Sequence, residues 1–140
     1  MADRLRWTVE APGFSAAVAY VGDELAGTVM GCPLPAETLW WRDMPATDSD
    51  LVREWDGRTF AVCEAFVLPE YRRHQLGLRM VTALLVGRPE ERVSLAVAET
   101  NTRVWGALQK MRFDHVGDLV PFPGWRSHRM LVRSLPLFDA

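Results

Sequence analysis

A nearly continuous apolar run over residues 59–68, which Pro69 ends, constrains the fold of this chain more than any other feature. Only Glu64 interrupts the run, which is typical of a central strand buried on both faces. Polar residues follow it, and apolar residues then recur at helical spacing from about Gly77 to the stop at residues 87–89. A strand that leads into a helix in this way is half of a parallel crossover, so the sequence predicts an α/β protein with helices on the faces of a sheet.

The other segments predict a mixed sheet. Apolar, β-prone stretches flank a Gly22-Asp23 turn and indicate an antiparallel hairpin. A further strand is followed by the N-cap cluster Thr100-Asn101-Thr102 and a second helix, and two strands close the chain. The predicted strands outside the central run are residues 14–21, 25–33, 93–98, 113–120 and 128–135. This order combines hairpins with parallel crossovers, and we expect one domain over residues 1–140.

Charge and hydropathy narrow the classes of partner. The net charge of −2 provides no general attraction to nucleic acid or to an anionic membrane. No run of about 18 apolar residues is present, and the first residues lack the apolar stretch of a secretory signal. We therefore expect a cytoplasmic protein with neither nucleic acid nor membrane as its partner.

The cysteines and histidines predict no metal site. Cys32 and Cys63 lie in apolar, strand-like runs, which suits two buried core thiols in a reducing compartment. The chain has no C-x-x-C pair and only three histidines. No metal is therefore expected.

The connection between the central strand and its helix has the composition of an anion site. The first backbone N–H groups of a helix have no partner within the helix and bind phosphate readily. Arg72, Arg73 and His74 add positive charge, and Gly77 allows close backbone approach or an unusual φ. These residues predict a pyrophosphate site, although basic residues in a loop can also be merely solvated.

Two motifs resemble those of the GNAT superfamily of N-acetyltransferases. Residues 66–78, Phe-Val-Leu-Pro-Glu-Tyr-Arg-Arg-His-Gln-Leu-Gly-Leu, are similar to the family's cofactor motif, Val-x-Pro-x-Tyr-Arg-x-x-Gly-x-Gly before a helix. Within its core, Q/R-x-x-G-x-G/A, Arg72 matches the first position and Gly77 the last, whereas Gln75 stands at the middle glycine. Residues 101–113 are similar to the family's Asn-x-x-Ala-x-x-Leu-Tyr-x-x-x-Gly-Phe helix.

The resemblance implies the acyl-CoA N-acyltransferase fold with acetyl-CoA as cosubstrate. The backbone of Phe66 and Val67 would pair with the pantetheine arm, and Asn101 would hydrogen-bond it, although Asn101 can equally be a helix cap. The implied cofactor-binding residues are Phe66, Val67, Arg72, Arg73, His74, Gln75, Leu76, Gly77, Leu78 and Asn101. Only about thirteen residues precede the first hairpin strand, where the family has a strand and two helices. This shortened N-terminal region leaves one wall of the acceptor cleft to a partner subunit, a separate domain or open solvent.

Acetyl transfer to an amine requires a base, a stabilised oxyanion and a proton for the leaving thiolate. Glu64 is the candidate base, because it is the only ionisable group in an apolar strand, where burial raises a carboxyl pKa, and the family often places a carboxylate on this strand. Glu64 can alternatively pair with an arginine or cap backbone groups, and Glu99 is the reserve candidate. In the family, the N–H at the position of Val67 faces the thioester carbonyl.

This sequence departs from the family's pattern at the proton donor. The tyrosine that usually supplies the proton in the family falls on Leu108, which has no proton to give. Water or another donor can serve a thiolate leaving group. Tyr71 is the nearest alternative, but its position beside Arg72 favours a packing or surface role.

The connection over residues 35–56 combines acidic residues with three tryptophans. Its carboxylates and the rings of Trp40, Trp41 and Trp55 could attract and stack a cationic amine. The carboxylates belong to Asp43, Asp48, Asp50, Glu54 and Asp56. A solvated acidic connection with tryptophans packed into the core is the alternative.

The sequence therefore predicts an acetyl-CoA-dependent N-acetyltransferase that transfers the acetyl group directly to a primary amine of a small molecule. Leu108, Gln75 and the short N-terminal region also allow a CoA-binding regulatory or interaction module with weak or no activity. A peptide acceptor and a homodimer remain open.

Overall fold

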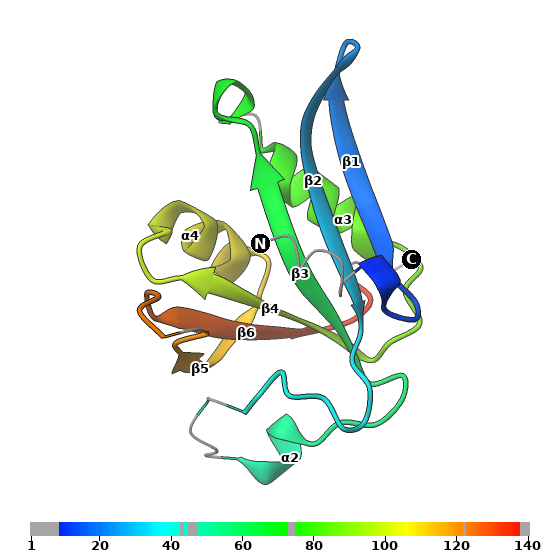
Figure 1. The fold of residues 1–140 in the computed structure, drawn as a ribbon, viewed down its shortest axis with the longest axis vertical. Helices are drawn as coiled ribbons and strands as arrows, with labels where there is room; N and C mark the ends of the chain where they lie inside the picture. The colour runs from blue at the N-terminus through cyan, green and yellow to red at the C-terminus, as the bar shows by residue number, and fades with distance from the viewer. Residues whose placement is uncertain (1–8, 43, 45–47, 73–74, 122, 138–140) are drawn as a thin grey trace.

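The computed structural model describes residues 9–42, 44, 48–72, 75–121 and 123–137. These residues contain a six-stranded mixed sheet with the strand order β1-β2-β3-β4-β6-β5 (Figure 1). The strands are β1 (Ser15–Val21), β2 (Glu24–Pro33), β3 (Thr59–Val67), β4 (Arg92–Ala98), β5 (Asp114–Leu119) and β6 (His128–Ser134). The β3–β4 pair is parallel and the other four pairs are antiparallel. The predicted α/β mixed sheet is therefore confirmed.

Helices follow each of the two parallel strands. The short 3-10 helix η1 (Pro69–Tyr71) and then α3 (Leu76–Leu85) follow β3, and α4 (Thr102–Lys110) follows β4. Helix α3 crosses behind β1, β2 and β3 in the view of Figure 1. In the described part of the chain, no helix is both long and apolar enough to cross a membrane.

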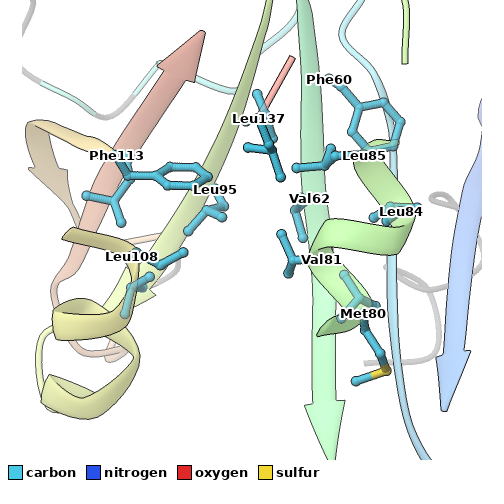
Figure 2. Packing of buried hydrophobic residues seen from close by; sticks show 14 residues of the cluster. Phe60, Val62, Met80, Val81, Leu84, Leu85, Leu95, Leu108, Phe113 and Leu137 are labelled. Carbon is cyan, nitrogen blue, oxygen red and sulfur yellow. The ribbon is translucent and has the colours of Figure 1, made fainter. Parts of the chain in front are cut away.

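Helices α3 and α4 contribute to one apolar cluster on what we call the helical face of the sheet. Figure 2 shows Val81 and Leu85 of α3 beside Val62 of β3, with Leu108 of α4 near Leu95 of β4. A second cluster, around Trp41, Met44 and Met130, covers β5 and β6 on the opposite face. Met130 and Leu131 are successive residues of β6 and enter different clusters, as the alternation of a strand requires.

The buried part of β3 is shorter than predicted. The side chains at residues 59–62 are buried, whereas those at residues 63–67 are half-buried or exposed. The prediction of burial on both faces is therefore wrong for the second half of the strand, where its parallel neighbour no longer accompanies it. The strand changes from a core element to a partly open one within its own length.

A buried ion pair joins the beginnings of β3 and β4 to the connection before them. Glu54, which follows the short helix α2 (Ser49–Val52), accepts from Arg92 at 2.7 Å and from Thr59 at 2.8 Å. Arg92 also donates to the Thr59 hydroxyl at 2.7 Å and to the Leu51 carbonyl at 2.7 Å. Both charged side chains are almost entirely buried, so each depends on the other to offset its lost hydration.

The tryptophans of this connection pack against the protein's own residues. Trp41 donates to Glu54 at 3.1 Å, Trp40 to Ser94 at 3.0 Å and Trp55 to Glu91 at 2.9 Å. The Arg58 guanidinium lies 4.3 Å from the ring centroid of Trp55, and that of Arg92 lies 5.4 Å from that of Trp41. These contacts favour the structural alternative over a cage for a cationic amine; Asp43 lies outside the described residues.

Replacement of Glu54 by alanine should destabilise the protein by about 3–5 kcal/mol, because it leaves the Arg92 charge buried without its partner. The matched control is Asp50→Ala, which breaks the exposed pair with Arg53 and should stay within about 0.5 kcal/mol of the wild type. Denaturant titration of both variants measures the difference. Equal stabilities of the two variants would contradict the role given to the buried pair.

Candidate functional site

The parallel strands β3 and β4 pair along only part of their length. Residues 59–62 of β3 pair with residues 92–95 of β4, and beyond them the two strands diverge (Figure 1). Among the described residues, no strand pairs with the remainder of either strand on the side of the gap. An unpaired strand edge can hydrogen-bond an extended molecule as if it were an added strand.

A β-bulge in β3 marks the start of this open part. Val62 lies opposite Gly31 and Glu64 opposite Met30, so Cys63 is an extra residue in β3. Without the bulge, Glu64 would share the face of Val62 and enter the apolar cluster beneath α3. Bulges redirect side chains in this way, often beside functional sites.

Side-chain alternation beyond the bulge assigns Glu64 to the opposite face. Val67 packs against the cluster of the helical face, and Ala65, two residues earlier, shares its side of the strand. Glu64 and Phe66 therefore lie on the face opposite α3. Glu64 is half-buried rather than fully buried as expected, whereas Glu99, the reserve base, is exposed after β4.

The backbone of β3 supplies a donor to the gap. The Leu68 N–H donates to Ala26 O of β2 at 2.8 Å, so the preceding N–H, that of Val67, points away from β2 and toward the gap. The Val67 carbonyl accepts from Arg72 Nε at 3.3 Å. A molecule that paired with this carbonyl would displace the Arg72 side chain.

The start of α3 borders the same end of β3. Its N-cap, Gln75, has the left-handed φ of 56°, and the Arg79 N–H donates to Gln75 O at 3.1 Å. The N–H groups of Leu76, Gly77 and Leu78 belong to the first turn, which has no intrahelical acceptor for them. A bound pyrophosphate would find these donors and the N-terminal end of the helix dipole.

One expectation for this loop needs correction. The unusual φ belongs to Gln75 and not to Gly77, which is helical; Gly77 instead provides space, since a Cβ built on it meets no atom within 4 Å. The Arg72 N–H already donates to Pro69 O at 3.3 Å, so Arg72 can contribute only its side chain. Arg73 and His74 lie outside the described residues.

Two residues of the motif over residues 101–113, Asn101 and Leu108, have structural roles in the fold. The Asn101 side chain is the N-cap of α4 and accepts from Val104 N at 3.3 Å, while the residue stays exposed. Leu108, at the tyrosine position of the motif, is 2% exposed and lies within the apolar cluster. A leucine in this position packs the core and has no catalytic function.

Tyr71 lies at the surface, in agreement with the role that the sequence favoured for it. Its hydroxyl donates to Glu24 Oε2 at the β1–β2 hairpin. This hydrogen bond, desolvation and the charge of Glu24 raise the pKa of the Tyr71 phenol. Tyr71 joins η1 to the hairpin and is not positioned as a proton donor.

The two cysteines form a pair that the sequence did not indicate. Cys32 is buried, but Cys63 is half-buried at the bulge, and the two sulfurs lie 3.9 Å apart. The hydrogen bond from Cys63 lowers the pKa of Cys32, against the opposing effect of burial. Within the described ranges, no group of three or more metal-ligating side chains is present.

A mixed sheet whose two parallel strands diverge beside the N-terminus of the following helix is the architecture of an acyl-CoA N-acyltransferase. A model of the acetyltransferase (GNAT) family matches residues 1–113 of the chain. The chain therefore belongs to the GNAT acetyltransferase family, and the predicted family is confirmed. A search of curated protein sequences found no match.

Solved structures share this fold at low sequence identity. Arabidopsis thaliana NAA60 in complex with acetyl-CoA has a TM-score of 0.70 and 18% identity, over 96% of this chain and 84% of that one. A GNAT family acetyltransferase from Elizabethkingia anophelis with acetyl-CoA bound has a TM-score of 0.69 and 10% identity, over 96% and 84%. Nourseothricin acetyltransferase has a TM-score of 0.64 and 22% identity, over 89% and 67%. These likenesses establish the fold.

Replacement of Gly77 by tryptophan should weaken CoA binding by about tenfold or more without unfolding the protein. The added side chain projects into open space at the start of α3, where the phosphates would lie, and so obstructs the ligand rather than the core. Gly106→Trp is the matched control, because Gly106 is also helical and its Cβ would also meet open space. Calorimetric titration with CoA measures the effect, and equal affinity in two folded variants would reject this location for the phosphates.

Replacement of Glu24 by glutamine should lower the pKa of the Tyr71 phenol, because it removes the carboxylate that keeps the phenol protonated. Ultraviolet absorbance during alkaline titration follows the phenols, and the chain has only two tyrosines, so Tyr71→Phe identifies the affected one. A titration curve that is the same in the wild type and Glu24→Gln would show that this contact is not maintained in solution.

Proposed function

We propose that this chain transfers an acetyl group from acetyl-CoA directly to a primary amine of a small molecule. The observation that carries this proposal is the position of Glu64 at the point where β3 leaves β4, turned by the bulge to the face opposite α3. The candidate base thus lies beside the gap on one face of the sheet, and α3 packs on the other face. Acetyl-CoA complexes of two proteins with this fold support the choice of cosubstrate.

The described residues suit the two ends of acetyl-CoA. The pyrophosphate would accept hydrogen bonds from the first turn of α3, where Gly77 leaves room for it, with Arg72 nearby. The pantetheine arm would pair with the open edge of β3 at Phe66 and Val67, and the Asn101 amide would lie across the gap at the start of α4. The other proposed contacts are Gln75, Leu76 and Leu78, together with Arg73 and His74 beyond the described ranges.

The reaction needs a neutral amine. In the proposed mechanism, Glu64 takes a proton from the ammonium group, directly or through water, and the amine nitrogen attacks the thioester carbonyl carbon. The Val67 N–H donates to the oxygen as negative charge develops on it. The C–N bond forms, the nitrogen loses its second proton to water, the C–S bond breaks, and the CoA thiolate leaves.

The leaving thiolate takes its proton from water in this proposal. Leu108 occupies the position of the usual tyrosine and is buried, and Tyr71 is bound to Glu24. A thiolate is a good leaving group, so the reaction does not depend on a positioned acid in the way that cleavage of an amide does. Because neither Leu108 nor Tyr71 is available as a proton donor, a CoA-binding module without turnover is the second candidate function.

Replacement of Glu64 by glutamine should lower kcat by about 100-fold and leave the Kd for CoA unchanged, because it removes the base and keeps the shape of the strand. The reduction relative to the wild type should be largest at low pH, because the neutral form of the amine is scarcest there. Thiol release from acetyl-CoA in the presence of an amine panel measures the rate, and Glu99→Gln is the control with near wild-type activity. CoA binding by the wild type without amine-stimulated thiol release would instead support the module without turnover.

A further inference from the structure

The surroundings of Glu64 indicate the chemistry of the acceptor, and this inference rests on the function proposed above. Two cross-strand rows can be traced over the face opposite α3. Ala16 of β1, Met30 of β2 and Glu64 of β3 form the first row, and Val18, Thr28 and Phe66 form the second. Neighbouring members of a row lie about 5 Å apart and act as one surface.

Glu64 is the only charged side chain in these two rows. The Thr28 hydroxyl donates to Ala17 O at 3.0 Å, so its hydrogen-bonding capacity is used within the sheet. Met30, Val18 and Phe66 are apolar, and the last two are 49% and 48% exposed. Exposed apolar side chains beside a single carboxylate are a common feature of ligand sites.

Three other carboxylates have partners away from these rows. Glu54 is buried against Arg92. Asp50 of α2 pairs with Arg53, the residue that follows this helix. Glu24 accepts from Tyr71. A second positive charge on an acceptor would therefore lie on an apolar surface with no anionic partner in either row, which costs free energy.

We propose that the acceptor is a monoamine whose amino group is attached to an apolar body, and that this body lies across Met30, Val18 and Phe66. Its single charge is complementary to the single carboxylate of Glu64, and its apolar part covers the exposed side chains of the two rows. Acetyl-CoA approaches Glu64 along the open edge of β3 from the start of α3, which packs on the other face of the sheet. The cosubstrate and the apolar body consequently do not compete for the same surface.

Hexylamine and 1,5-diaminopentane test the proposal, because they have equal length and differ only in whether a methyl group or a second amine ends the chain. Thiol release from acetyl-CoA gives kcat/KM for each, counted per amino group. Hexylamine should be preferred by about tenfold or more, the range expected when an apolar surface distinguishes such groups. Equal values, or a preference for the diamine, would overturn the proposal.

Val18→Asp places a second carboxylate on this surface and should reduce or reverse the preference for hexylamine. Val86→Asp is the matched control, because Val86 is 73% exposed at the end of α3 and should leave the preference unchanged. An unchanged preference in folded Val18→Asp would show that the apolar body lies elsewhere, and the proposal would be wrong. Acetylation of the diamine alone would reject this inference and preserve the proposed function, whereas binding of acetyl-CoA with no amine acetylated would reject both.

Discussion

The limited pairing of β3 with β4 is the constraint on which the rest of the site depends. The two strands share hydrogen bonds over residues 59–62 and 92–95 and then separate. At their joined end, the buried pair of Glu54 and Arg92 holds both strands and the connection before them. Because this end is fixed by charge and hydrogen bonding, the other end can remain open at little risk to the fold. The open edge of β3 and the start of α3 then border one gap.

The bulge at Cys63 divides the two tasks of the site between the two faces of the sheet. On the helical face, Val67 packs beneath α3, whose first turn is the proposed site for the pyrophosphate. On the opposite face lie Glu64 and Phe66. A regular strand would have placed Glu64 in the apolar cluster, where a carboxylate is costly and out of reach of an amine. One extra residue therefore moves the Glu64 side chain from the apolar cluster to the opposite face, where the proposed function needs it.

Hydrophobic periodicity predicted most of the architecture, because the elements bury one stripe or one face each. The run ending at Pro69, the helix from about Gly77 and the closing strands were all found within a few residues of their predicted bounds. The bulge was not predicted, since an extra residue in one strand is defined only by its partner strand. The same limit applies to the Cys32–Cys63 pair, to the contacts of the tryptophans and to the rows around Glu64, all of which depend on register.

The two departures from the family's glycines show what each glycine position contributes. Gln75 stands at the middle glycine of the cofactor motif and Arg112 at the glycine of the second motif, and both keep the left-handed backbone with φ of 56° and 66°. A left-handed conformation costs a residue with a side chain about 1 kcal/mol, so the surrounding structure must impose it. At these two positions the motif requires a left-handed backbone, which a residue other than glycine can adopt at a cost in conformational free energy. At Gly77 the backbone is helical and a Cβ would meet no atom within 4 Å, so this position requires no special conformation, and a small residue here leaves room for the proposed ligand.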